Sequence, residues 1–184
     1  MANSRFGLPI VLAAIALVAV VAPLHATAQV ASETRSTKSA DGVLITYEVH
    51  GTGPTTLVFV HGWSCDRTYW RSQLDAFIRD YQVVTIDLAG HGASGATRTD
   101  WSIRRFADDV ASVIRAVDAR NVITIGHSLG GPVALETALL MPDRVTGVIG
   151  VDTFLDGWGG NGFPRLIERL RMNFAAETRL RTRR

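Results

Sequence analysis

The sequence predicts an α/β fold in which a mostly parallel sheet is covered by helices on both faces. Four short apolar runs, rich in β-branched residues, alternate with segments of helical periodicity. Strands that are apolar throughout are typical of sheets buried on both faces, and their alternation with helices indicates parallel pairing. A chain of 184 residues is long enough for one domain with a substantial core. The apolar runs lie at 56–60, 82–86, 121–125 and 145–151.

The first 28 residues have the layout of a secretory signal peptide. Arg5 supplies a positive charge, an apolar run covers 10–22, and Ala26-Thr27-Ala28 is a small-x-small cleavage site. A membrane anchor is the alternative, but a spanning helix needs about 20 apolar residues. We therefore expect cleavage after residue 28, export to the periplasm or the extracellular space, and no stable membrane anchor in the mature protein.

The other elements can be placed in chain order. Residues 29–37 are polar and are expected to be loose, and Asp41-Gly42 is a hairpin-turn signal. Apolar residues at helical spacing predict three helices that follow the first three apolar runs. The second of these helices is expected to begin behind a cap at Asp100. The helices cover about 69–78, about 100–117 and about 128–141, where Pro142 ends the last one.

Each apolar run ends in a polar or glycine-rich segment. The carboxyl ends of parallel strands meet at one edge of the sheet, which is where active sites form in such folds. The four segments are therefore expected to deliver their side chains to the same edge. Their sequences are HGWSCD (61–66), DLAGHGASG (87–95), GHSLGG (126–131) and VDTFLDGWGGNG (151–162).

The third of these segments contains a candidate nucleophile. Gly126-His127-Ser128-Leu129-Gly130 matches the pattern G-x-S-x-G and lies between a predicted strand and a predicted helix. A strained turn there would lift the Ser128 hydroxyl clear of the backbone, and side chains at 126 or 130 would collide with the adjoining strand and helix. An ordinary strand-to-helix turn with a capping serine is the alternative.

Three of these segments, in this order and at this spacing, resemble the alpha/beta-hydrolase family over about residues 36–160. The resemblance implies that Ser128 is a nucleophile. It also implies an oxyanion hole formed by the backbone N–H groups of Trp63 and Leu129. Two such donors stabilise the negative charge that acyl transfer places on a carbonyl oxygen. The segments that carry the resemblance are FVHGWSCD (59–66), DLAGHGASG (87–95) and GHSLGG (126–131).

A serine nucleophile needs a base to accept its proton, and no histidine of the mature chain is an evident base. The resemblance gives His61 a supporting role in its loop, and His91 is expected to be held by backbone contacts. At a turn of this kind the side chain of His127 points away from the serine. His50 precedes the strand at 56–60 and is expected at the opposite end of the sheet.

In the family that the chain resembles, the acid and the histidine follow the nucleophile in the sequence. Asp152 ends the last predicted strand and is the candidate acid, with a pocket or loop residue as the alternative. We expect residues 29–152 to be the N-terminal part of a hydrolase core that lacks strands seven and eight. Residues 153–184 resemble the start of a cap, and because the sequence stops within this segment we expect a truncated or frame-shifted gene product or a partial sequence.

These observations favour a serine hydrolase that acts on an ester, a lactone or a related carbonyl of a small molecule. The alternative is an inactive fragment or a non-catalytic binding protein on the same fold, because the expected histidine is absent. A formal net charge of +2 gives no basis for nucleic-acid binding. No cofactor-binding motif or metal-ligand pattern is present, Cys65 is the single cysteine, and the oligomeric state stays open.

Overall fold

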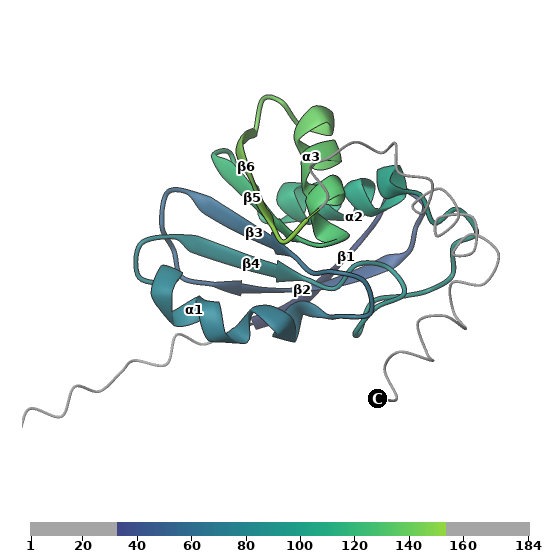
Figure 1. Cartoon of the computed structure of the whole chain (residues 1–184), viewed down its shortest axis with the longest axis horizontal. Helices are drawn as coiled ribbons and strands as arrows, with labels where there is room; N and C mark the ends of the chain where they lie inside the picture. Colours follow the sequence, from purple (N-terminus) through teal and green to yellow (C-terminus); the bar gives the residue numbers. More distant parts are fainter. Residues whose placement is uncertain (1–32, 154–184) are drawn as a thin grey trace, which may run out of the picture.

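The computed structural model describes residues 33–153 of the chain (Figure 1). The predicted signal peptide lies outside the described residues, and so does the predicted cap segment apart from Thr153 at its start. None of the described helices has the length and the apolar character needed to cross a membrane.

The described strands form a six-stranded sheet with the order β1-β2-β4-β3-β5-β6. β1 pairs with β2 and β2 with β4 in antiparallel fashion, whereas the other neighbours are parallel. This mostly parallel sheet confirms the predicted fold class. The strands are β1 (Glu33–Lys38), β2 (Leu44–His50), β3 (Thr56–Val60), β4 (Gln82–Ile86), β5 (Val122–His127) and β6 (Val145–Val151).

Three of the four predicted apolar runs coincide with β3, β4 and β6, and β5 begins one residue later than predicted and continues to His127. The prediction that residues 29–37 are loose was wrong for 33–37, which belong to β1. β1 pairs with β2 across the turn that contains Gly42, where φ is +85°. Backbone pairing rather than apolar burial forms this edge strand, because its side chains are mostly exposed.

Helices lie on both faces of the sheet, α1 on one and α2 and α3 on the other (Figure 1). The predicted cap at Asp100 was wrong, since Ser102 is the N-cap of α2 and its hydroxyl accepts from the N–H of Arg105 at 3.3 Å. Asp100 instead accepts from the N–H of Ser102. The helices are α1 (Arg71–Phe77), which follows a 3-10 turn η1 (Arg67–Trp70), α2 (Ile103–Ala116) and α3 (Gly130–Leu140).

The central strand β3 divides the core into two parts. Val58 and Val60 belong to the larger cluster, which includes the buried side chains of α2 and α3. Leu57 and Phe59 point to the opposite face, where they pack with Trp70 and the side chains of α1. Every residue of β3 is buried, as expected for a strand with apolar neighbours on both faces. This buried strand carries the loop at 61–63 to the edge of the sheet where the parallel strands β3, β4 and β5 end.

β6 is an edge strand among the described strands, because β5 is its one partner there. Its last four residues are exposed, although the strand carries no charged side chain. Leu135 and Leu139 on α3, which packs against β6, are also exposed. We call the exposed apolar residues of these two elements the β6 flank, and they are Leu135, Leu139, Val148, Ile149 and Val151.

Candidate active site

Ser128 lies between β5 and α3 in a left-handed backbone conformation, with φ at +51°. This conformation costs a residue with a side chain about 1–2 kcal/mol. Backbone hydrogen bonds fix both sides of the turn. The N–H of Ser128 donates to the carbonyl of Val151 at 3.1 Å, and the carbonyl of Ser128 accepts from the N–H of Gly131 at 3.0 Å. The strained turn has the geometry that the motif predicts.

The two glycines of the motif are required by close approach of the backbone. A Cβ atom at Gly126 would overlap the carbonyl oxygen of Gly130 at the start of α3. A Cβ atom at Gly130 would overlap the carbonyl oxygen of Val60 at the end of β3. The predicted collision of side chains at 126 and 130 is therefore confirmed, with backbone atoms as the obstacle in both cases.

The loop after β3 lies directly against this turn. A Cβ atom at Gly62 would lie 2.9 Å from Nδ1 of His127 and 3.2 Å from Cβ of Ser128. The two backbone segments that contain Trp63 and Leu129 are thus brought together at Ser128. Leu129 precedes the first residue of α3, so the N–H groups at the positive end of the helix face the same region.

Ser64, in the loop after β3, is a second residue near the site with a left-handed backbone. Its φ is +60°, and the N–H of Cys65 donates to the carbonyl of Gly62 at 3.3 Å across the turn. The sequence contained no signal for this conformation, because a left-handed residue in a turn is more often glycine or asparagine. The turn directs the chain from Trp63 toward η1.

His61 is fully buried and both of its ring nitrogens are used. Nδ1 donates to the carbonyl of Gly62 at 2.8 Å, and Nε2 accepts from the N–H of Leu88 at 3.1 Å. Burial, together with the nearby His91 ring, lowers the pKa of His61 to about 3. The ring is therefore neutral and joins the loops after β3 and β4, which is the supporting role that the resemblance implies.

His91 packs beside His61, with 5.0 Å between the ring centroids, and its Nδ1 is 3.0 Å from the carbonyl oxygen of Ala89. The ring also meets Trp63 edge-on at 5.7 Å. Burial lowers the pKa of His91. The histidine thus contacts the backbone of its own loop, as expected, and supports the residue after Gly62.

The other two histidines among residues 33–153 are His127 and His50, which have different surroundings. The ring of His127 stacks on Tyr69, with a centroid distance of 4.8 Å and an interplanar angle of 19°. His50 is paired in register with Val83, near the first residue of β4, so it lies at the edge of the sheet opposite Ser128. Within residues 33–153, no hydrogen bond joins a histidine ring to the hydroxyl of Ser128.

Asp87 holds the loop that follows β4. The buried carboxylate accepts from the backbone N–H of Arg67 at 2.7 Å and from that of Ala93 at 2.8 Å, and it forms an ion pair with the Arg67 guanidinium. Gly92 has φ at +51°, and a Cβ atom there would overlap this carboxylate. These contacts fix the loop that follows β4. Asp87 therefore has a structural role.

Asp152 follows β6 and is exposed, with φ at +43°. It follows Val151, whose carbonyl accepts from the N–H of Ser128, so this hydrogen bond brings the backbone next to the candidate acid to Ser128. The next residue, Thr153, was missed in the sequence. Its hydroxyl donates to the carbonyl of Ser128 at 2.7 Å.

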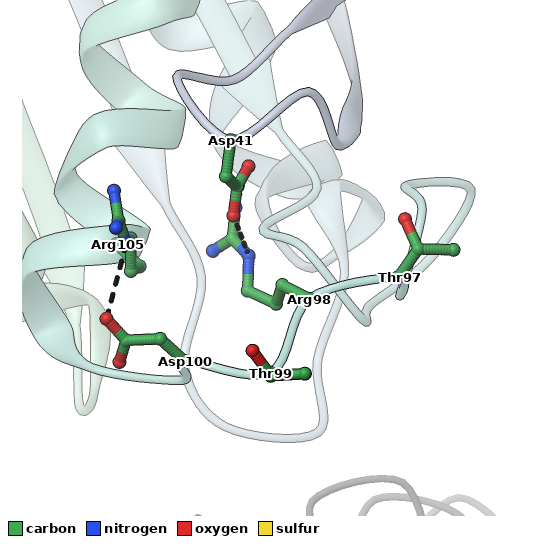
Figure 2. A pocket seen from close by; sticks show the side chains of 6 residues that line it. All are labelled: Asp41, Thr97, Arg98, Thr99, Asp100 and Arg105. Carbon is green, nitrogen blue, oxygen red and sulfur yellow. Dashed lines mark hydrogen bonds and ion pairs between the residues drawn. The ribbon is translucent and has the colours of Figure 1, made fainter.

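A surface cavity of about 210 Å³ lies away from these residues, between the β1–β2 turn and the start of α2 (Figure 2). Two ion pairs line it, Arg98 with Asp41 at 2.9 Å and Arg105 with Asp100 at 3.3 Å. The cavity contains none of the predicted site residues. Within residues 33–153, no group of three or more metal-ligating side chains is present.

Comparison with known proteins identifies related chains over this region. The model of the alpha/beta hydrolase fold matches residues 55–183. A protein of Azorhizobium caulinodans named as a carbamate hydrolase, RutD, is 35% identical over 120 residues, which cover 65% of this chain and 43% of RutD. Epoxide hydrolase B of Mycobacterium tuberculosis is 35% identical over 111 residues, which cover 59% of this chain and 31% of that protein.

Solved structures show the same relationship. An esterase from Rhodococcus sp. has 33% identity and a TM-score of 0.62, and the match covers 71% of this chain and 50% of the esterase. A hydrolase from Pseudomonas aeruginosa has 27% identity and a TM-score of 0.68, with coverages of 79% and 54%. The chain thus spans less than half the length of these two curated relatives and about half that of the two solved structures.

Proposed function

Because this chain belongs to the alpha/beta-hydrolase fold family, we propose that it carries the nucleophile and the oxyanion hole of a serine hydrolase. The proposed substrates are esters, lactones or related carbonyl compounds. The observation that carries the proposal is the left-handed Ser128 between β5 and α3, with the Gly62 loop in contact with it.

In the proposed reaction the hydroxyl oxygen of Ser128 attacks the carbonyl carbon of the substrate. The hydroxyl proton passes to a base, and the carbonyl oxygen becomes an oxyanion. The N–H groups of Trp63 and Leu129 are the proposed donors to this oxyanion. Removal of one such donor costs about 2.7–4 kcal/mol in other hydrolases. The oxyanion then reforms the carbonyl and expels the leaving group, and water later releases the acyl group from Ser128.

The identity of residue 128 and the relatives support the proposed substrate class. Relatives named as a carbamate hydrolase and an esterase act on carbonyl compounds by those names. A relative named as an epoxide hydrolase also matches, but a serine at the nucleophile position favours acyl transfer over the ring opening performed by relatives with an aspartate nucleophile. Asp152 is the proposed acid partner, and the proton acceptor is not assigned to any described residue.

Labelling by a fluorophosphonate tests the proposal, because this reagent reacts with activated serines. We expect the wild-type protein to gain the mass of one phosphonyl group and the Ser128→Ala variant to gain none. The measurement is the intact mass before and after labelling, with circular dichroism to show that both proteins are folded. In the same assay Asp152→Asn is expected to label more slowly at an unchanged Tm, and an unchanged rate would leave Asp152 as a turn residue alone.

The second candidate function is that of a non-catalytic binding protein on the same fold. One observation favours it: no histidine of residues 33–153 hydrogen bonds to Ser128. A folded wild-type protein that gains no mass from the fluorophosphonate would support this candidate and contradict the first.

We also propose that the protein is exported, on the basis of the charge, apolar run and cleavage pattern of residues 1–28. N-terminal sequencing of the protein from the periplasmic or culture fraction is expected to start at Gln29. Recovery of the protein in the cell interior with an intact Met1 would contradict export.

A further inference from the structure

Thr153 returns to the nucleophile turn immediately after β6 has ended. Its hydroxyl donates to the carbonyl of Ser128 at 2.7 Å, a contact between residues that are 25 positions apart. The left-handed backbone of Asp152, with φ at +43°, makes the turn that places Thr153 there. Aspartate is one of the few residues with a side chain that is enriched in this conformation.

Two glycines leave the space that Thr153 occupies. A Cβ atom at Gly131, in the first turn of α3, would overlap the Thr153 hydroxyl. A Cβ atom at Gly150, near the end of β6, would lie 2.5 Å from the Thr153 methyl group. The side chain therefore fits between α3 and β6, with its hydroxyl on one glycine and its methyl group on the other.

We propose that Thr153 is a positioning residue for the Ser128 nucleophile, an inference that rests on the proposed function. A strained backbone conformation persists only when its surroundings hold it from several sides. The N–H of Ser128 is held by Val151, and its carbonyl is held by Gly131 and by Thr153. The Thr153 hydroxyl is the side-chain contribution to this set, and it fixes the peptide plane between Ser128 and Leu129.

That peptide plane also contains the N–H of Leu129, the proposed oxyanion donor. A rotation of the plane would therefore move the hydroxyl-bearing residue and the donor together. Thr153 thus acts on the chemistry through Ser128 and Leu129 and is not expected to touch the substrate. Its loss should lower the rate of the chemical step and leave binding of the reagent almost unchanged.

Two conservative variants separate the hydroxyl from the shape of the side chain. Thr153→Val keeps a branched side chain between the two glycines but removes the donor to Ser128. Thr153→Ser keeps the donor and removes the methyl group that faces Gly150. If Thr153 only fills space, Thr153→Val should retain more of the labelling rate than Thr153→Ser. If its hydroxyl positions Ser128, Thr153→Ser should retain more of the rate than Thr153→Val.

The first experiment measures fluorophosphonate labelling of the full chain over a range of reagent concentrations. This separates the maximal labelling rate from the concentration at half-maximal rate. We expect Thr153→Val to lower the maximal rate about tenfold, in the range of one lost hydrogen bond, with little change in half-maximal concentration or Tm. Thr153→Ser should stay within about twofold of the wild type. Equal rates for all three proteins, or a greater loss with serine than with valine, would overturn the proposal.

A second experiment keeps the inference testable if the wild-type protein is not labelled and the proposed function fails. Amide hydrogen exchange reports the hydrogen bonds of the turn directly. We expect the N–H groups of Ser128 and Gly131 to exchange about tenfold faster in Thr153→Val than in Thr153→Ser, with the buried amide of Val58 as the internal control. If the amides of Ser128 and Gly131 exchange at the same rates in Thr153→Val as in Thr153→Ser, the hydroxyl does not hold the turn.

Discussion

Gly130→Ala is expected to destabilise the fold by about 3 kcal/mol and to abolish labelling of Ser128, because the added methyl group has no room between α3 and the end of β3. The added Cβ atom would overlap the carbonyl oxygen of Val60 and lie 2.8 Å from that of His61. Both obstacles are backbone atoms of β3 and its loop, so no side-chain rotation relieves them. Either α3 or the loop that contains Trp63 must move, and the proposed oxyanion hole moves with it.

Gly147→Ala is the matched control, because it adds the same atom to a glycine in β6. The nearest atom to that Cβ would be Cγ1 of Ile123 at 3.5 Å, an ordinary contact. We expect this variant to stay within about 0.5 kcal/mol of the wild type. Urea unfolding of both variants, with fluorophosphonate labelling in parallel, checks the pair. Equal stability of the two variants would contradict the close approach of α3 to β3.

The second large effect is expected from Arg98→Met, which leaves a buried carboxylate without its cation. The side chains of Arg98 and Asp109 are 2% and 0% exposed, and they form an ion pair at 2.5 Å. Ser39 Oγ and the N–H of Ala89 also donate to the carboxylate, at 2.6 and 3.2 Å. Loss of one partner of a buried pair typically costs about 3–5 kcal/mol, and we expect a loss in this range near pH 7.

This loss should depend on pH in a defined direction. Burial raises the pKa of Asp109, and the hydrogen bond and charge of Arg98 counteract the shift. A raised carboxyl pKa means that the folded state binds the proton more tightly than the unfolded state. Stability therefore falls as the pH rises from the unfolded pKa, about 3.9, to the folded pKa. Without Arg98 this window extends to higher pH, so the deficit of Arg98→Met should shrink as the pH is lowered toward 4.

Arg105→Met is the control, because Arg105 lines the same surface cavity (Figure 2) but pairs in a more exposed setting. Its side chain is 39% exposed, and its partners are Asp100 and Asp108 at 3.3 Å. Exposed ion pairs contribute about 0–1 kcal/mol, so we expect a loss below about 1 kcal/mol. Urea unfolding from pH 4 to pH 8 compares the two variants. The role of the buried pair would be contradicted if Arg98→Met lost no more unfolding free energy than Arg105→Met, or if its loss did not change with pH.

The limits of β3, β4, β5 and β6 were predictable to within two residues because these strands consist mainly of apolar residues between polar or glycine-rich segments. β1 was not, since its polar side chains form a strand only through backbone pairing with β2. The start of α2 was misplaced because Asp100 and Ser102 are both good capping residues. Two residues apart, they can be distinguished only by their backbone geometry.

The site was predictable where backbone crowding demands glycine and unpredictable where a single side chain reaches across the fold. The glycines at 126 and 130 predict the turn at Ser128 from the sequence alone. Thr153 carries no comparable signal, because its role depends on the left-handed Asp152 and on the packing of α3 against β6. The related feature of the sequence is the presence of glycine at both 131 and 150. These glycines leave room for a side chain, but the sequence alone does not identify it as Thr153.

The β6 flank is expected to make the measured rates and stabilities depend on the protein concentration. Among residues 33–153, no strand pairs with the outer edge of β6, and the apolar side chains of the β6 flank are exposed. Strand edges of this kind pair with one another, and the attraction between apolar surfaces grows in sulfate salts. Association of copies is second order, so it disappears on dilution while the properties of a single molecule do not. Labelling rates, unfolding curves and exchange rates should therefore be recorded at several dilutions and extrapolated to the separate chain.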